Sequence, residues 1–281
     1  MPKHIPPYNN NNQPIVEENN KTVPLVYYNQ VRLNKGEKHS FHLKRHESCV
    51  TVASGSIEAN VGGEVFENIG KRDSIWTGNP ESIYAPLDTP VEFSCISDNC
   101  EVFIAGGIAE NKLTPFAVRA EETPIIQYGS DETKTHRKIK HILGKNVEGK
   151  VDKLLVSELF TVGAGGWSGF PSHKHDEDRL PHETRFEEVY QFRFNPEQGF
   201  GAQFGTLEGE EVGDVFHIRN GSTYLIDYGY HPCVAAPGYE MYYFTIIVGA
   251  STRSLIQHFH PDHVHQVETI PGIKDMIAGF K

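Results

Sequence analysis

The chain has 281 residues, of which 38% are hydrophobic and 22% charged, and its formal net charge is −11 at pH 7. This length predicts about two compact domains, and the apolar content is too high for a disordered chain. The negative charge argues against nucleic acid or an anionic membrane surface as a partner, and no apolar run is long enough to span a membrane.

Three further features of the sequence bear on the cellular location of the protein, the state of its cysteines and a bound metal. Residues 1–7 contain no apolar stretch of the kind found in a signal peptide, so a cytoplasmic location is expected. The four cysteines fall at no metal-binding or disulfide spacing, as expected of reduced thiols: they are Cys49, Cys95, Cys100 and Cys233. Of the 15 histidines, nine lie between residues 173 and 265, and such clustering indicates a bound metal or pH-dependent chemistry.

The first half of the chain has the pattern of short β-strands. Residues 1–20 are polar and rich in Asn and Pro, which predicts a poorly ordered arm. From about residue 25, alternating or β-branched runs follow one another, with turn residues about every 8–12 positions. Gly62 and Gly63, for example, predict a hairpin turn. No long helical pattern interrupts this rhythm before residue 110.

The second half repeats the pattern after a more polar stretch. Residues 110–150 carry charge without strand alternation, so we expect a linker with a short helix. Strand-like runs resume at 154–160 and continue to 242–248, and a short helical segment is expected at 273–277. Many short strands without crossover helices predict an all-β fold of antiparallel barrels or sandwiches. The expected division is an N-terminal module at 21–115, a linker at 116–144, a C-terminal module at 145–265 and a tail at 266–281.

The strongest chemical signal is the pair His173 and His175. Histidines at i and i+2 on a strand point to the same face, so both imidazoles can approach one cation. Glu188 opens a later apolar strand, and His231 follows a strand and a tight turn in the same module. Such a set suits a divalent Zn, Mn, Fe or Ni ion with positions left open for a ligand. The alternative is that His231 caps a turn and Glu188 is a solvated strand end.

This order of residues resembles the cupin superfamily, and further blocks resemble the 5-deoxy-glucuronate isomerase family of myo-inositol catabolism. These blocks are Phe186-Glu187-Glu188, Asn195-Pro196-Glu197-Gln198-Gly199, Gly229-Tyr230-His231-Pro232, Ala236-Pro237-Gly238, Pro261-Asp262-His263 and, in the first half, Ile69-Gly70-Lys71-Arg72-Asp73-Ser74-Ile75-Trp76. The resemblance covers roughly residues 25–265. It implies a bicupin, with two cupin-type β-barrel or jelly-roll modules joined by short helical linkers.

The resemblance also implies the ligand set His173, His175, Glu188 and His231. Twelve residues separate His175 from Glu188, which is more than in most cupins but agrees with this family. Glu187 is the alternative, and Glu188 is preferred because it directly precedes an apolar strand, as in the family.

The first module shows no comparable set. His39, His42 and His46 stand three and four residues apart, a spacing that does not place all three on one face of a strand. This half is therefore expected to be a degenerate cupin without a metal, with a second metal site as the alternative.

The activity that the resemblance implies is aldose–ketose isomerisation of a sugar acid, most simply 5-deoxy-glucuronate to 5-dehydro-2-deoxy-gluconate. A divalent metal, Zn or Mn first and Fe or Ni as alternatives, would hold both substrate oxygens and stabilise an enediol. Tyr190 and Tyr243 are the predicted catalytic residues, while His258 and Glu187 are alternative bases. For each of these residues, a role in packing is the competing interpretation.

An anionic substrate requires local positive charge in an acidic protein. Arg185 and Arg193 are predicted to bind the substrate, together with Gln203 and His258. Lys174 alternates away from the two histidines and is not expected to contribute. Phe204 stands where the family commonly has an arginine, which leaves the identity of the sugar acid open.

Other interpretations stay open at this point. The histidines at 258, 260, 263 and 265 are either a second metal site or a polar strand end near the active-site mouth. The alternatives to an isomerase are an iron-dependent cupin dioxygenase and a non-catalytic sugar-binding bicupin, which bound metal and oxygen uptake would distinguish. The expected partner is a small-molecule sugar acid, and exposed sheet edges leave homo-oligomerisation open.

Overall fold

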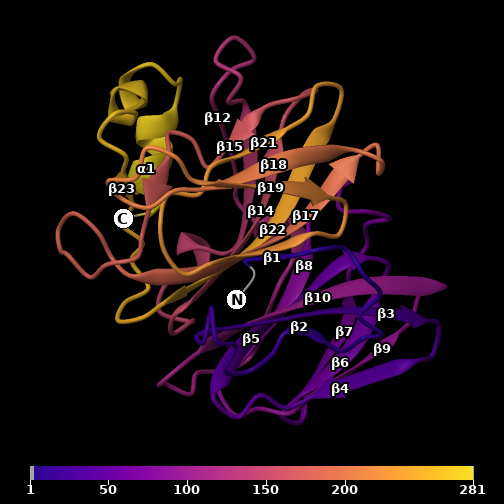
Figure 1. The fold of residues 1–281 in the computed structure, drawn as a ribbon. Helices are drawn as coiled ribbons and strands as arrows, with labels where there is room; N and C mark the ends of the chain where they lie inside the picture. Colours follow the sequence, from indigo (N-terminus) through magenta and orange to yellow (C-terminus); the bar gives the residue numbers. More distant parts are fainter. Residues whose placement is uncertain (1–2, 281) are drawn as a thin grey trace.

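The computed structural model describes residues 3–280 and is built almost entirely of antiparallel strands. Figure 1 shows two modules, with the N-terminal half of the chain in indigo and purple and the C-terminal half in magenta to yellow. Each module pairs one large sheet with one small sheet. This confirms the predicted all-β fold of two cupin-type modules. None of the described helices combines the length and apolar character needed to cross a bilayer.

The N-terminal module encloses one hydrophobic core between its two sheets. Its six-stranded sheet has the order β11 (Phe116–Val118), β8 (Glu81–Ala85), β5 (His46–Ser54), β10 (Asn99–Ile108), β3 (Val26–Asn34) and β2 (Pro14–Val16). Its four-stranded sheet has the order β4 (Lys38–Phe41), β9 (Val91–Cys95), β6 (Ile57–Val61) and β7 (Glu64–Ile69). The burial of β6 alternates residue by residue, because this small sheet has one face on the core and one in solvent.

The C-terminal module has the same plan with a third, short sheet added. Its seven-stranded sheet has the order β1 (His4–Ile5), β20 (Thr223–Ile226), β17 (Phe186–Asn195), β22 (Glu240–Gly249), β14 (Leu154–Thr161), β13 (Arg137–Leu143) and β12 (Ile125–Tyr128). Opposite lie β15 (Trp167–Ser168), β21 (Cys233–Ala235), β18 (Phe200–Gly205) and β19 (Asp214–Arg219). The pair β16 (His173–Lys174) and β23 (His258–Phe259) completes the barrel wall.

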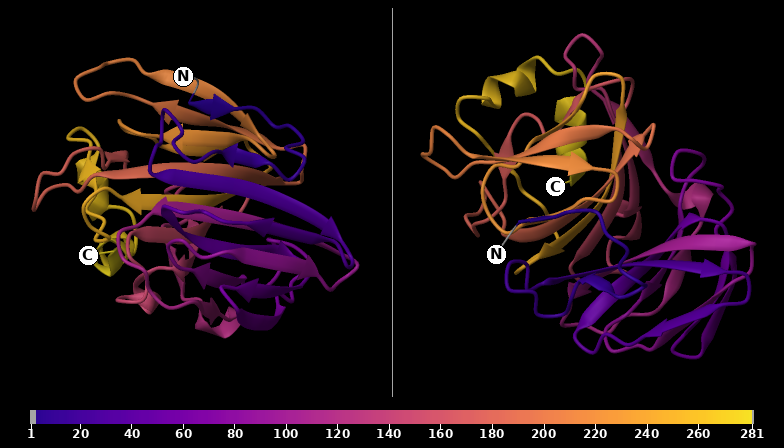
Figure 2. Two further views of the ribbon diagram at one scale, coloured as in Figure 1. Left: turned by 90° about the horizontal axis from the view of Figure 1, so that it is seen from below. Right: turned by 45° about the vertical axis from the view of Figure 1, so that its right-hand side comes forward.

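The two large sheets pack against each other, back to back, at the centre of the molecule (Figure 2). Each is therefore buried on both faces, one toward its own barrel and the other toward the neighbouring module. This explains why β14 and β22 are buried along almost their whole length and do not alternate. On β22, Tyr242 and Phe244 face the other module, whereas Tyr243 faces the barrel interior.

Buried ion pairs and hydrogen bonds cross the contact between the modules. Arg72, from the N-terminal module, holds both carboxylate oxygens of Glu158 on β14, at 2.9 and 2.6 Å. Trp76 packs edge-on against Phe160, with ring centroids 5.9 Å apart. These contacts give a structural role to the Ile69–Trp76 block, in which the resemblance to the isomerase family extends into the first module.

The structure differs from the sequence expectation between residues 116 and 144. Instead of a linker, this stretch contributes β11 to the N-terminal sheet, and β12 and β13 to the C-terminal sheet. The short 3-10 helix η1 (Ala120–Glu122) lies between β11 and β12. A second 3-10 helix, η2 (Lys145–Val147), follows β13. The strand pattern of β13 was hidden because two of its buried side chains, Arg137 and Lys140, are charged.

The chain ends are also more ordered than expected over the described residues. β1 adds to the edge of the C-terminal sheet through β20, and β2 adds to β3 of the N-terminal sheet. The buried Asn10 amide donates to the Gln30 carbonyl oxygen at 2.8 Å, so the polar arm is held by hydrogen bonds. At the other end, η3 (Val264–Glu268) leads into α1 (Ile273–Phe280), which covers one end of the C-terminal barrel (Figure 2).

Candidate metal centre and its pocket

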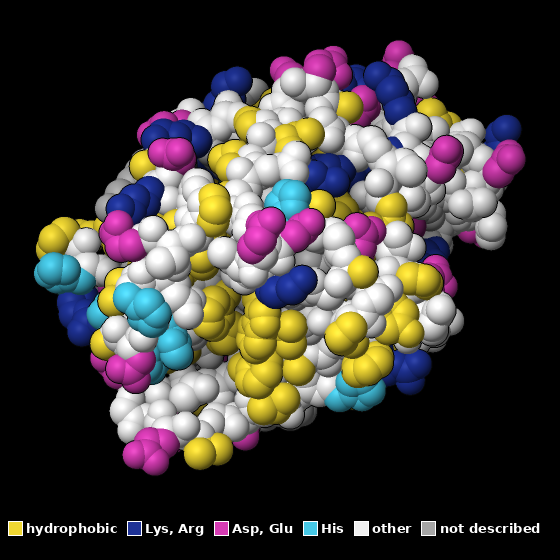
Figure 3. Space-filling view, turned by 90° about the horizontal axis from the view of Figure 1, so that it is seen from above, with side chains coloured by type: hydrophobic (Ala, Val, Ile, Leu, Met, Phe, Trp, Pro, Cys, Tyr) yellow, Lys and Arg dark blue, Asp and Glu magenta, His cyan; other side chains and the backbone are white. Residues whose placement is uncertain are grey.

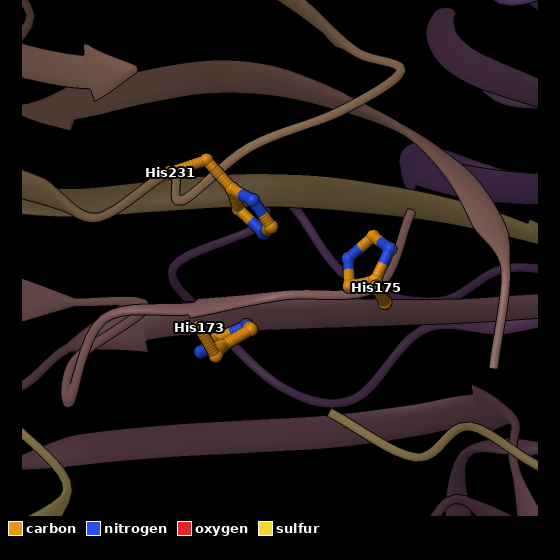
Figure 4. A group of neighbouring side chains, drawn as sticks. All are labelled: His173, His175 and His231. Carbon is orange, nitrogen blue, oxygen red and sulfur yellow. The ribbon is translucent and has the colours of Figure 1, made fainter. Parts of the chain in front are cut away.

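Three histidines of the C-terminal barrel meet at one point. His173 lies on β16, His175 directly follows that strand, and His231 lies on the turn after β20. One ring nitrogen from each lies within 4.8 Å of the others, and all three side chains are buried. Figure 4 shows the three rings turned toward a common space. This spacing is that of a metal site, and among residues 3–280 no second group of three ligating side chains has it.

Backbone carbonyls fix the direction of each imidazole. The Nδ1 atoms of His173 and His175 lie 3.2 Å from the carbonyl oxygens of Pro171 and Phe186, and Nδ1 of His231 lies 2.8 Å from that of Gly229. A carbonyl oxygen only accepts hydrogen bonds, so the proton is on Nδ1. Nε2 is therefore the ring nitrogen left to bind a metal, as in histidines that bind metals through Nε2, although at His173 the Gln257 side chain also contacts this atom.

Glu188 brings a carboxylate to the same centre from β17. Its Oε2 lies 3.1 Å from Nε2 of His175 and 3.5 Å from Nε2 of His231. Thr245 on the neighbouring strand β22 donates to Oε1 at 2.6 Å and fixes the carboxylate. Burial alone would raise the pKa of Glu188, but the neighbouring imidazoles of His175 and His231 outweigh it and hold that pKa well below its usual range.

Glu187 points to the opposite face of β17, as strand alternation requires. Its Oε2 accepts a hydrogen bond from the backbone N–H of Leu25, in the N-terminal module, at 2.7 Å. Burial raises the pKa of Glu187 to about 7. The structure therefore places Glu188, and not Glu187, beside the histidines.

A pocket inside the C-terminal barrel is lined by His173, His175 and Glu188. Tyr190 and Tyr243 both line it, with ring centroids 4.4 Å apart, and the ring of Tyr190 lies 6.1 Å from that of His231. Burial holds the pKa of both phenols well above the ordinary value, so both keep their protons at neutral pH. Ile273 and Met276 of α1 also line the pocket, at the end of the barrel that this helix covers.

Several pocket residues were missed in the sequence. Gln257, whose side-chain nitrogen lies 2.9 Å from Nε2 of His173, and Thr245 contact the ligand set directly. Thr245 follows Tyr243 by two positions on β22, so strand alternation could have identified it. Arg137 and Tyr128 also line the pocket, but they lie in the segment expected to be a linker.

Four predicted substrate-binding residues lie away from this pocket. Arg193 is on the same face of β17 as Glu187 and pairs with Glu101 of the N-terminal module at 3.0 Å. Arg185, two positions before Glu187, is exposed. His258 is paired with Lys174 across β16 and β23, on the side away from the pocket.

The fourth predicted residue, Gln203, has a structural role. Its buried amide nitrogen donates to the carbonyl oxygens of His231 and Pro232, at 2.8 and 3.2 Å. It therefore fixes the backbone that carries His231 and makes no contact with the pocket. Lys174, with its ammonium between Asp176 at 2.7 Å and Glu183 at 3.0 Å, similarly secures the segment that carries the other two histidines.

The second histidine cluster, at 258–265, lies at the surface. The rings of His260 and His263 are 4.9 Å apart, and His260 also lies against Tyr230 at 4.6 Å. In the view from above, histidine side chains gather along one edge of the molecule (Figure 3). His258, His260 and His263 are half-buried and His265 is exposed, which agrees with a polar strand end near the barrel.

Two antiparallel barrels joined through their large sheets, with a buried histidine triad in the second, define a bicupin. The chain belongs to the KduI/IolB family, whose model matches residues 3–266. A curated 5-deoxy-glucuronate isomerase of Bacillus licheniformis is 30% identical over 249 residues, which cover 88% of this chain and 90% of the relative. The chain is therefore an isomerase, and the resemblance to this family is confirmed.

Solved structures agree with this assignment. An IolB-like protein from Salmonella typhimurium superposes with a TM-score of 0.80 at 26% identity, over 86% of this chain and 89% of that one. The formate complex of Lactobacillus farciminis oxalate decarboxylase superposes with a TM-score of 0.64 at 11% identity, over 100% and 97%. At that identity the second likeness shows the fold alone.

Proposed function

We propose that the protein converts 5-deoxy-glucuronate to 5-dehydro-2-deoxy-gluconate, at a divalent metal ion held by His173, His175, His231 and Glu188. The observation that carries the proposal is the convergence of three Nε2 atoms and one carboxylate on a single buried point. The relatives are named 5-deoxy-glucuronate isomerase. Conversion of an aldehyde to a ketone in such a sugar acid suits a site with this set of ligands.

The side chains themselves indicate that a cation belongs at this point. With the proton on Nδ1, the Nε2 lone pair of His175 would face the carboxylate of Glu188 at 3.1 Å, which is repulsive unless a proton or a metal lies between them. Nε2 of His231 is buried and has no hydrogen-bond partner among the described residues. The nitrogen and oxygen donors suit zinc or manganese, with iron or nickel as alternatives.

The protein groups around this point have separate tasks in the isomerisation. The bound metal would supply Lewis-acid stabilisation of the negative charge that develops on the two reacting oxygens. The apolar wall and α1 exclude water, which strengthens every electrostatic interaction inside the pocket. Tyr190 and Tyr243 keep their protons at neutral pH, so their hydroxyls can donate to substrate oxygens. The Tyr243 hydroxyl also accepts from Arg137 and shares a 2.6 Å hydrogen bond with Ser168. An aldose–ketose exchange moves the carbon-bound proton from C2 to C1, which needs a base, and the hydroxyl proton from the C2 oxygen to the C1 oxygen, which a phenol can relay.

The direct test is proton NMR of 5-deoxy-glucuronate incubated with the purified protein. We expect the aldehyde signals to be replaced by those of the ketose, without oxygen consumption in a parallel electrode measurement. His173→Ala, with its fold checked by circular dichroism, serves as the inactive control. If the wild-type protein leaves this and related uronates unchanged, the proposed function is wrong. Oxygen uptake would favour the dioxygenase instead.

A further inference from the structure

Arg137 is a buried cation without an anion. It lies on β13, is 4% exposed and lines the same pocket as the histidines. Its guanidinium donates to the hydroxyl oxygens of Tyr128 and Tyr243, the latter at 2.7 Å, while Nε is buried and has no partner. Among residues 3–280, no carboxylate pairs with it. Burial raises the pKa of both phenols, so neither hydroxyl supplies a negative charge.

Other buried cations of the chain are compensated. Arg72 holds Glu158 through two hydrogen bonds, and Lys174 lies between two carboxylates. The half-buried Arg253 is likewise met by backbone carbonyl oxygens, at 2.9 to 3.1 Å. A charge removed from water without such partners is costly, so an unpaired guanidinium that opens into a pocket indicates an anionic ligand.

The surroundings of Arg137 suit a carboxylate in particular. A guanidinium presents a planar fork of N–H donors that matches the two oxygens of a carboxylate. The Tyr128 hydroxyl accepts from Arg137, and its own proton has no acceptor among the described residues, so it is free to donate to the same ligand. Tyr243 and Tyr190 connect this end of the pocket to His231.

We propose that Arg137, with the Tyr128 hydroxyl, binds the carboxylate of the substrate and orients its other end toward the histidines. In a six-carbon uronate the aldehyde and the carboxylate are at opposite ends, as this two-ended pocket requires. The inference rests on the proposed function for the choice of sugar acid. Arg137 also supplies the local positive charge that an anionic substrate needs in a protein of net charge −11.

The test compares an acid with its neutral analogue. The value of kcat/KM is measured for 5-deoxy-glucuronate and for 5-deoxy-glucose, in which a hydroxymethyl group replaces the carboxylate. Arg137→Met should lower the value for the acid about 100-fold and change that for the neutral sugar less than about threefold. Arg193→Met is the matched control, because it removes a guanidinium from the other face of the same sheet. It should leave the acid-to-neutral ratio unchanged.

Two milder variants keep the test decisive if Arg137→Met does not fold. Arg137→Lys retains the charge but loses the fork, and Tyr128→Phe loses one donor, so each should lower the acid-to-neutral ratio about 3- to 30-fold. An unchanged ratio in the folded Arg137 variants and in Tyr128→Phe overturns the proposal.

A binding measurement separates this inference from the proposed function. Glucuronate should raise the Tm of the wild-type protein and not that of Arg137→Lys, whether or not any substrate turns over. If the wild-type protein isomerises no uronate but keeps this difference in Tm, the function is wrong and the anion site stands. If the wild-type protein, Arg137→Lys and Tyr128→Phe all turn over the acid equally well, the proposed function stands and the anion site is wrong.

Discussion

The direction of three imidazole rings is set by three backbone carbonyls. Because His173, His175 and His231 each use Nδ1 on a carbonyl oxygen, Nε2 is the nitrogen available at the centre. The tight turn before His231 thus has a chemical role, since the Gly229 carbonyl both belongs to the turn and orients the ring. Gln203 holds the same segment from β18. A ligand set of this kind depends on loops that are fixed in place.

At this scale the first prediction concerns His231. We expect His231→Ala to lower metal affinity by more than the roughly 10- to 100-fold that loss of an outer-shell partner causes, and to abolish isomerisation. The fold should survive, because other side chains form the core of the C-terminal barrel. His265→Ala, at an exposed histidine, is the matched control. Metal content by elemental analysis is the measurement, and full metal content in His231→Ala would contradict the site.

A second prediction concerns acid stability. Burial lowers the pKa of His141 to about 4, whereas an unfolded histidine titrates near 6.5. Between these pH values the unfolded chain binds the additional proton, so acid lowers the free energy of unfolding through this residue. In His141→Asn the loss of stability from pH 7 to pH 5 should be smaller by about 1–2 kcal/mol. Urea unfolding at both pH values checks this, and an equal loss in both proteins would refute it.

At the scale of elements, strand alternation decides most of the site. On β17 the even positions, including Glu188 and Tyr190, face the barrel, and the odd positions, including Glu187 and Arg193, face the other module. The sequence was sufficient for Glu188 because period-2 alternation is a local property. It was not sufficient for Arg137, because charged residues at buried positions of β13 concealed the strand pattern.

The helix α1 provides the prediction at this scale. Ile273 and Met276 pack into the barrel core and line the pocket, so replacing both by Ala should weaken the docking of the helix by about 2–4 kcal/mol. Turnover should fall and hydrogen exchange in the helix should rise, while the global Tm changes little. Lys274→Ala, on the exposed face, should change neither quantity. Unaltered turnover in the double variant would show that α1 does not close the pocket.

At the scale of the whole molecule, the modules form one body through their large sheets. The sequence indicated two similar modules but not that their sheets pack back to back, because a run of buried residues looks the same whichever neighbour covers it. The Arg72–Glu158 pair illustrates this: the residues are 86 positions apart and their side chains are fully covered. The first module thereby supports the sheet that carries Glu188.

This arrangement predicts a large effect of a residue far from the pocket. Arg72→Met removes the two-pronged partner of the buried Glu158 and leaves only the Tyr242 hydroxyl at 3.0 Å and Lys140 at 3.8 Å, so it should cost about 3–5 kcal/mol of unfolding free energy. Lys38→Met breaks an exposed pair with Glu92 and should cost less than about 1 kcal/mol. Denaturant unfolding of both variants gives the comparison. Similar losses in the two variants would mean that the contact between the modules does not depend on this pair.

If this isomerase acts through a divalent metal at His173, His175, Glu188 and His231, removal of the metal must abolish turnover. The most direct measurement is to strip the protein with a chelator, count the remaining metal, and follow turnover of 5-deoxy-glucuronate as zinc or manganese is returned. We predict about one ion per chain, no turnover in the stripped protein, and recovery in proportion to the metal bound. Undiminished turnover by the metal-free protein would contradict the account.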